Sequence, residues 1–178
     1  MMRIRGYIAA SLDGYIAAAD GSVDWLLEFQ QQDFGFANFL EDIETVILGR
    51  STYDQVWSFG VGWPYAGKRA IILTSRPVEN LPPGAEAWNG PVEELAAKLR
   101  TEGGGDAWVV GGASVQRAFL DAGALDRIEL FVIPVLLGDG VPLWPKSDHG
   151  HRLSLTAMER LEGGMVRLDY RFERPSAA

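Results

Sequence analysis

The chain has 178 residues, 47% hydrophobic and 22% charged, which predicts a single domain over residues 1–178 with enough core to fold unaided. Cysteine is absent, which excludes disulfides, thiolate metal sites and a cysteine nucleophile. The net charge of −8 argues against a nucleic-acid partner, because binding to a phosphate backbone relies on clustered cations. We see neither a signal peptide nor a membrane span, and we expect a cytoplasmic protein with no membrane partner.

Four short apolar runs predict buried strands of a parallel sheet. In chain order they are Ile4–Ala10, Thr45–Leu48, Ala70–Thr74 and Ala107–Val110. Two helical patterns accompany them. Pro91–Arg100 has one apolar face and a proline suited to the first turn, and the stretch from Val115 to Ala122 repeats this pattern before Gly123 ends it. The alternation of strand and helix predicts an α/β fold.

The last third of the sequence predicts an antiparallel addition to this sheet. Arg127–Ile133 is a further strand, and Leu153–Met158 and Met165–Phe172 alternate about Gly163-Gly164 as the two strands of a hairpin do. The fold class that we expect is therefore a mostly parallel central sheet flanked by helices, with a C-terminal antiparallel hairpin.

Two of the predicted strands end at glycine and pass directly into helix-compatible sequence. These junctions are Val46–Tyr53 and Val109–Val115. The unpaired N–H groups at such helix starts suit a phosphate, and glycine lets a ligand approach the backbone closely. Arg50 adds a planar cation suited to a phosphate monoester, although an exposed salt bridge is the alternative for it. Two such junctions in one domain suggest a dinucleotide across the carboxyl ends of the strands, the alternative being purely structural turns.

Other charged residues have simpler interpretations. Lys68, Arg69 and Arg76 lie near Arg50 in the sequence and could complete a local basic patch. Asp13 precedes a glycine and is expected to form a turn rather than to act as an acid. We predict no metal site, because His149 and His151 have no third ligand placed by the sequence.

A series of motifs runs nearly end to end: Ala9–Ala17, Val46–Tyr53, Pro64–Lys68, Ile71–Ser75, Gly111–Ser114 and Ile133–Gly140. In order and spacing this series resembles the dihydrofolate reductase-like superfamily, which includes the reductase domain of bacterial riboflavin biosynthesis. The resemblance implies a dihydrofolate reductase-like fold and a reductase that uses NADPH. It also implies a homodimer, for which Ile128–Leu137 and the region of Trp144 could supply an apolar contact.

The same resemblance implies which residues bind NADPH. Those at the adenosine-side phosphates are Gly49, Arg50, Ser51 and Thr52. Those near the 2′-phosphate are Thr74, Ser75 and Arg76. The pyrophosphate turn comprises Gly111, Gly112, Ala113, Ser114 and Val115. The strand whose backbone would meet the nicotinamide contributes Ala9 and Ala10.

Hydride transfer belongs to the cofactor, so the protein must orient the ring, exclude water and supply a proton. By resemblance to folate reductases, Asp33 occupies the place of the catalytic acid, before the first cofactor junction. A helix cap or a solvated carboxylate is the alternative for Asp33. The residues that could bind a flat heterocyclic substrate are Tyr7, Trp25, Phe34, Tyr53 and Trp57, with Phe36 beside them; core packing is the alternative for each aromatic ring.

On the substrate side the chain departs from the riboflavin-pathway enzymes. Tyr7 stands where they usually have lysine, and Trp57–Trp63 replaces their acidic-proline and arginine segment. We expect an NADPH-dependent reductase of a heterocycle, with 5-amino-6-(5-phosphoribosylamino)uracil as the family-level substrate. Dihydrofolate or a pterin is the alternative substrate. An NADP-binding protein without turnover, or a phosphoribosyl-binding module, is the alternative function.

Overall fold

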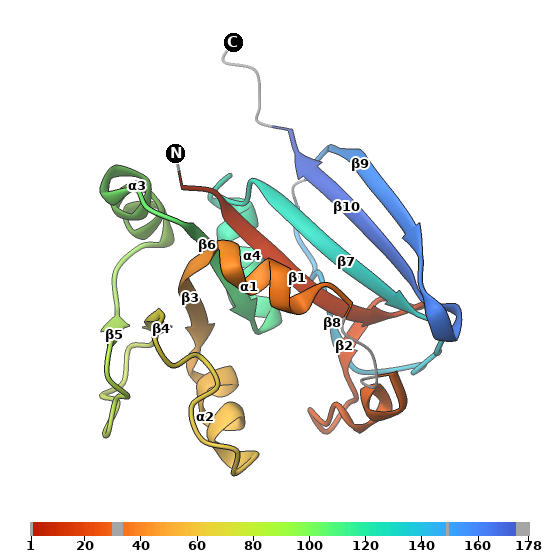
Figure 1. Ribbon diagram of the computed structural model, residues 1–178, viewed down its shortest axis with the longest axis horizontal. Coiled ribbons are helices and arrows are strands. Elements are labelled where there is room, and N and C mark those ends of the chain that lie inside the picture. The colour runs from red at the N-terminus through yellow and green to blue at the C-terminus, as the bar shows by residue number, and fades with distance from the viewer. Residues whose placement is uncertain (1, 30–33, 149, 174–178) are drawn as a thin grey trace.

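A computed structural model describes residues 2–29, 34–148 and 150–173 of the chain (Figure 1). Its main feature is an eight-stranded sheet in the order β5-β4-β3-β6-β1-β7-β10-β9. The strands are β1 (Ile4–Ser11), β3 (Ile43–Gly49), β4 (Arg69–Leu73), β5 (Ala85–Trp88), β6 (Asp106–Gly111), β7 (Arg127–Ile133), β9 (Leu153–Arg160) and β10 (Val166–Phe172). All neighbours from β5 to β7 are parallel, and the β9–β10 hairpin joins β7 in antiparallel fashion. The predicted sheet is confirmed.

In the described part of the chain, four α-helices flank the sheet: α1 (Phe36–Asp42), α2 (Arg50–Ser58), α3 (Val92–Glu102) and α4 (Ala113–Asp121). Residues of α3 and α4, such as Leu95 and Phe119, pack with Ile47 of the sheet in one core cluster. Residues of α1 and α2, such as Phe39 and Tyr53, belong to a second cluster. Within the described ranges, no helix is long and apolar enough to cross a membrane.

Local signals set the ends of most elements. Helix α3 follows Pro91 and ends before Gly103, whose φ of +72° is the left-handed conformation that suits a helix stop. Strand β5 was not predicted, because it has only four residues and Glu86 interrupts its apolar run. It lies at the edge of the sheet, where a strand needs less apolar sequence.

A small ribbon ties together the loops that follow β1 and β7. Strands β2 (Tyr15–Ala17) and β8 (Val141–Pro142) pair with each other, and the short 3₁₀ helices η1 (Asp24–Phe29) and η2 (Glu162–Gly164) lie elsewhere in the connections. Asp13 accepts hydrogen bonds from Ser11 Oγ at 2.6 Å and from the Gly138 amide at 2.7 Å. These bonds, that from Ser11 first, hold the pKa of Asp13 below its usual range. Asp13 is thus a loop-fixing residue, as predicted.

The predicted basic patch is wrong for two of its members. Lys68 and Arg69 lie at the amino end of β4, whereas Arg50 follows the carboxyl end of the parallel strand β3. Lys68 donates to two backbone carbonyls around the end of α1. Arg69 pairs with Glu86 and Glu102. Closeness in the sequence does not mean closeness in space here. Strands β3 and β4 are parallel, so the connection returns the chain from the carboxyl end of β3 to the amino end of β4.

The apolar contact expected for a second copy, from Ile128–Leu137 and the region of Trp144, stays a prediction. Strand β7 lies inside the sheet, between β1 and β10. Its residues Ile128 and Phe131 are 1% and 4% exposed, so this chain's own core uses them. Trp144 packs against Phe172, with 6.2 Å between the ring centroids. Leu130 and Val132 of the same strand are only half-buried, and Leu136 after it is 70% exposed, so part of the segment keeps apolar surface that a second copy could contact.

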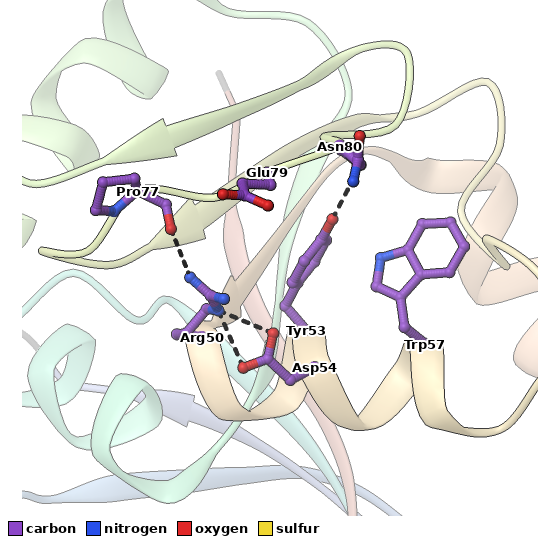
Figure 2. A pocket seen from close by; sticks show the side chains of 7 residues that line it. All are labelled: Arg50, Tyr53, Asp54, Trp57, Pro77, Glu79 and Asn80. Atoms are coloured by element: carbon purple, nitrogen blue, oxygen red, sulfur yellow. Dashed lines mark hydrogen bonds and ion pairs between the residues drawn. The ribbon is translucent and has the colours of Figure 1, made fainter.

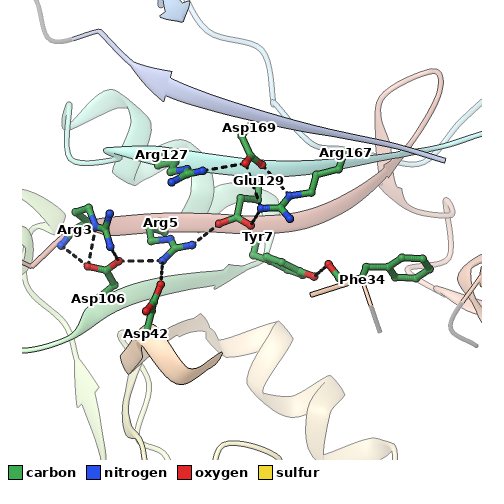
Figure 3. Close-up of polar contacts among 10 residues, drawn as sticks. All are labelled: Arg3, Arg5, Tyr7, Phe34, Asp42, Asp106, Arg127, Glu129, Arg167 and Asp169. Carbon is green, nitrogen blue, oxygen red and sulfur yellow. Dashed lines mark hydrogen bonds and ion pairs between the residues drawn. The ribbon is translucent and has the colours of Figure 1, made fainter. Parts of the chain in front are cut away.

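A cluster of buried charges crosses the middle of the sheet (Figure 3). Arg5 of β1 donates hydrogen bonds to Asp42 and Asp106, both at 3.0 Å, and to Glu129. Arg167 of β10 reaches the second oxygen of Glu129 at 2.7 Å. The four cations of the cluster are Arg3, Arg5, Arg127 and Arg167, and the four anions are Asp42, Asp106, Glu129 and Asp169. Arg3 and Asp42 are more than half exposed, whereas Arg5, Asp106, Glu129 and Asp169 are buried, and every buried charge of the cluster has a partner of opposite sign, as burial requires.

Candidate functional site

The two glycine junctions meet in space. A β-carbon built on Gly49 would lie 2.8 Å from Cγ2 of Val115, and one built on Gly112 would lie 3.4 Å from Oγ1 of Thr52. Gly111, at the end of β6, has a φ of +133°, which L side chains rarely adopt. The first junction thus needs Gly49 in order to approach the second, whereas the second needs Gly111 for its backbone conformation. The predicted convergence of the two junctions is present.

A long groove of about 820 Å³ runs from these junctions to β1 and the β2–β8 ribbon. The helices α2 and α4 both begin at this groove. Their N-cap residues are Gly49 and Gly112, and no side chain makes a capping hydrogen bond at either helix start. At the start of α4 the Val115 N–H donates to the Gly112 carbonyl at 3.0 Å, and the N–H groups before it have no side-chain acceptor and suit an anion. The predicted cofactor residues that line this groove are Ala9, Ser51, Thr52, Gly111, Gly112, Ala113 and Ser114.

A second cavity, the aromatic cavity, has about 680 Å³ and adjoins the groove along β1. The two cavities share Tyr7, Ile8, Ala9 and Leu26 as lining residues. Three of the residues predicted for substrate, Tyr7, Phe34 and Phe36, line it. The Tyr7 hydroxyl donates to the Phe34 carbonyl at 3.3 Å. A flat ligand in this cavity would therefore lie against a ring held in the groove at Ala9.

A third cavity, of about 470 Å³, lies between α2 and the loop after β4 (Figure 2). We call it the Arg50 cavity. Arg50 Nε donates to both carboxylate oxygens of Asp54, at 2.8 and 3.0 Å, and Nη1 donates to the Pro77 carbonyl at 2.9 Å. Tyr53 and Trp57 line this cavity, and neither lines the aromatic cavity. The structure thus separates these two predicted substrate residues from Tyr7 and Phe34.

Residues 4–167, which are most of the chain, match the family model of the RibD C-terminal domain. The chain belongs to the RibD C-terminal domain family. It is 38% identical over 165 residues to the uncharacterized protein YwjB of Bacillus subtilis (strain 168), covering 92% of this chain and 94% of that protein. It is 26% identical over 147 residues to the riboflavin biosynthesis protein RibD of Corynebacterium ammoniagenes, covering 75% of this chain and 43% of that protein.

Solved structures agree with the family and with the fold. A putative riboflavin biosynthesis protein from Shewanella sp. PV-4 superposes with a TM-score of 0.87 at 29% identity, covering 97% of this chain and 100% of that one. The dihydrofolate reductase from Enterococcus faecalis, complexed with NADP(H) and RAB-propyl, superposes with a TM-score of 0.66 at 19% identity, covering 97% of each chain. The predicted dihydrofolate reductase-like fold is confirmed.

The remaining cofactor residues implied by the resemblance surround the cavities without lining them. Gly49 and Val115 form the contact between the junctions, and Ala10 is buried at 3% exposure. Thr74, Ser75 and Arg76 follow β4 and precede Pro77, which accepts the hydrogen bond from Arg50. Thr74 Oγ1 accepts a hydrogen bond from the Arg76 amide at 3.1 Å, which closes this turn.

Two other predicted residues also lie outside the cavity linings. Asp33 falls outside the described residues, so its role stays a prediction. Trp25 packs against the buried cluster of Phe131, Ile133 and Met165, next to the aromatic cavity. The predicted wall of aromatic rings is therefore built mainly by other side chains.

Sequence reasoning missed most of the lining of the aromatic cavity. The lining residues that were singled out for neither substrate nor cofactor are Ile8, Leu26, Phe29, Tyr65, Trp108, Phe131, Ile133 and Met165. Burial raises the pKa of Tyr65 to about 12, so its hydroxyl stays protonated at neutral pH. Trp108 is 6% exposed, and its indole Nε1 has no hydrogen-bond partner among the described residues. These two groups are donors for which a ligand could supply an acceptor.

The described part of the chain has no group of three or more His, Asp or Glu side chains placed to hold a metal ion. Of the two histidines, His149 lies outside the described residues. The imidazole of His151 lies 3.8 Å from a carboxylate oxygen of Asp121, at the end of α4.

Proposed function

We propose that the chain is an NADPH-dependent reductase that transfers hydride to a flat heterocyclic substrate. The observation that carries this proposal is the continuity of the long groove with the aromatic cavity. The groove begins at two helix starts suited to phosphate and ends at Ala9, which it shares with that cavity. A dinucleotide laid along the groove would thus bring its nicotinamide to the wall that a substrate ring also touches.

The residues present fit this cofactor. The backbone amides at the starts of α2 and α4, with the hydroxyls of Ser51, Thr52 and Ser114, would hold the pyrophosphate. The small side chain of Ala9 leaves room for the nicotinamide, and NADPH would supply the hydride. The aromatic residues beyond Ala9 exclude water from the place where the two rings meet.

The proton for the substrate is assigned to Asp33 in this proposal. Among the described residues, the lining of the aromatic cavity contains no Asp, Glu, His, Lys or Arg side chain. Its protic groups are the hydroxyls of Tyr7 and Tyr65 and the indole N–H of Trp108, which suit orientation of a neutral ring. Asp33, which directly precedes Phe34 in the sequence, would complete the set.

The family and the riboflavin biosynthesis relative support a substrate from riboflavin biosynthesis, for which the resemblance in the sequence implies 5-amino-6-(5-phosphoribosylamino)uracil. The cavity itself favours a second candidate, a dihydrofolate or pterin, since its described lining offers no cation to a phosphoribosyl group. Titrating the protein with NADPH and NADH by fluorescence, then assaying NADPH oxidation with each substrate, tests both. If neither nucleotide binds, the proposal is wrong. Binding without oxidation would favour an NADP-binding protein without turnover.

Arg50→Ala is expected to raise the Kd for NADPH about tenfold or more and to change the Kd for NADH less than about twofold. The reason is the loss of a charge-assisted hydrogen bond to the 2′-phosphate, a group that NADH lacks. The titration above measures both constants. Arg69→Ala is the control, because Arg69 lies at the opposite end of the sheet. Equal losses for both nucleotides would show that Arg50 does not contact the 2′-phosphate.

Asp33→Asn is expected to lower kcat about 10²- to 10⁴-fold, the usual contribution of a general acid, while the Kd for NADPH stays nearly unchanged. Steady-state kinetics with whichever substrate is confirmed provide the measurement. Asp24→Asn, an exposed carboxylate at the start of η1, is the control. Unaltered turnover in Asp33→Asn would remove this residue from the mechanism.

A further inference from the structure

The Arg50 cavity has a net negative lining, which does not suit a phosphate. Its lining includes one guanidinium, that of Arg50, and two carboxylates, those of Asp54 and Glu79 (Figure 2). Asp54 engages Arg50 Nε with both oxygens, and the Pro77 carbonyl engages Nη1. The cation on which a 2′-phosphate would depend is therefore already bound by an anion of the same cavity.

This ion pair is one that a ligand can displace. Arg50 and Asp54 are one helical turn apart on α2, and their side chains are 27% and 51% exposed. Exposed pairs with this spacing are weak, because water screens both charges. A 2′-phosphate could thus draw the guanidinium away from Asp54, but the carboxylate would remain on α2 beside the phosphate and repel it.

A ribose with a free 2′-hydroxyl experiences the same carboxylate differently. The hydroxyl is neutral and donates a hydrogen bond, and a carboxylate near the adenosine ribose is the usual acceptor for it in NAD sites. Asp54 therefore acts against NADPH and not against NADH.

We propose that Asp54 is a specificity-determining residue, which lowers the preference of this site for NADPH over NADH by holding Arg50 and repelling the 2′-phosphate. Glu79, on the opposite wall of the Arg50 cavity, adds to the repulsion without pairing with Arg50. The inference rests on the proposed function, since it concerns the nucleotide that is proposed to lie along the long groove.

Asp54→Asn tests the proposal. The amide keeps the shape of the side chain and removes its charge, so the Kd for NADPH is expected to fall about fivefold, the effect of one unit charge near a phosphate at a solvated site. The Kd for NADH is expected to stay within about twofold. Adenosine 2′,5′-bisphosphate against ADP, measured by calorimetry, should repeat the difference, and the effect should shrink as salt rises.

Asp121→Asn is the matched control. Arg117 and Asp121 form the same kind of pair on α4, with contacts of 2.6 and 2.8 Å, so this variant removes an equal charge away from the Arg50 cavity. It is expected to leave the ratio of the two Kd values unchanged, whereas Glu79→Gln should raise the preference for NADPH by less than Asp54→Asn does.

The outcomes separate the two proposals. If the wild-type protein binds both nucleotides and Asp54→Asn leaves their ratio unchanged, the role of Asp54 is overturned while the proposed function stands. An equal change in Asp121→Asn would also overturn it, because net charge alone would then be the cause. If the wild type binds neither nucleotide, both proposals fail. Thermal unfolding of each variant confirms that a lost signal is not lost fold.

Discussion

Replacing Arg5 with methionine is expected to lower the free energy of unfolding by about 3–5 kcal/mol, the usual cost of removing one partner from a buried ion pair. Arg5 is 5% exposed and donates to carboxylates of three elements, Asp42 of α1, Asp106 of β6 and Glu129 of β7. Methionine fills similar space but leaves Glu129, at 3% exposure, with Arg167 as its remaining partner. Urea unfolding measures the change.

Arg3→Met is the matched control for this prediction. Arg3 contacts the same carboxylate, Asp106, at 2.7 Å, but its side chain is 54% exposed. Its loss is therefore expected to cost about 0–1 kcal/mol. Losses of equal size would show that burial is not what makes Arg5 important.

The difference in unfolding free energy between the wild type and Arg5→Met is expected to depend on pH. Burial acts to raise the pKa of Asp106, but hydrogen bonds from Arg3 and Arg5 outweigh it, and the pKa lies below its usual range. A carboxylate with a lowered folded-state pKa stabilises the fold above its unfolded pKa, and this contribution is lost as pH falls through the folded value. The gap in stability between the wild type and Arg5→Met is therefore expected to narrow in acid.

The buried charges also bear on the candidate site. Strands β1 and β7 and helix α1 contribute Tyr7, Phe131 and Phe36 to the aromatic cavity, and the same three elements contribute Arg5, Glu129 and Asp42 to the cluster. Ion pairs across these elements fix their relative positions because each bond has a defined direction. The cluster thus supports the shape of the cavity from one side.

The sheet was predictable from local patterns, whereas this cluster was not. Runs such as Val46–Leu48 are apolar without interruption, which is typical of a strand buried on both faces. Arg5 and Glu129 instead alternate with apolar residues, the pattern of a strand with one face in water. The two residues are 124 positions apart, and only the order β6-β1-β7-β10 brings their partners together.

The candidate site likewise has one part that local sequence patterns predict and one part that they do not. The meeting of the two glycine junctions was predictable because glycine at the end of a strand is a local signal, and Gly49 and Gly111 both carry it. The aromatic cavity gave no such signal. Trp108 lies within an apolar run of a central strand, where any large side chain is expected in the core. Tyr53 was assigned to substrate by composition, but its place on α2 directs it toward the loop after β4.

Replacing Gly49 with alanine is expected to weaken NADPH binding about tenfold or more and to lower the free energy of unfolding by about 1–3 kcal/mol, as overpacking of a core does. The new methyl group would lie 2.8 Å from Cγ2 of Val115, a buried β-branched side chain that is 6% exposed and has few alternative rotamers. The start of α4 must then move away from the start of α2, and a displacement near 1 Å is enough to spoil a shared phosphate site.

The compensating change is Val115→Ala in the same chain, because it removes the methyl group that the new β-carbon would strike. If the contact between the junctions causes the loss of affinity, the double variant should recover most of the NADPH affinity that Gly49→Ala loses. A double-mutant cycle over the two substitutions should then give a coupling energy of about 1 kcal/mol or more. Additive losses would mean that the two junctions bind the nucleotide independently. Recovery would instead show that the phosphate subsite is a property of their contact, which neither glycine provides alone.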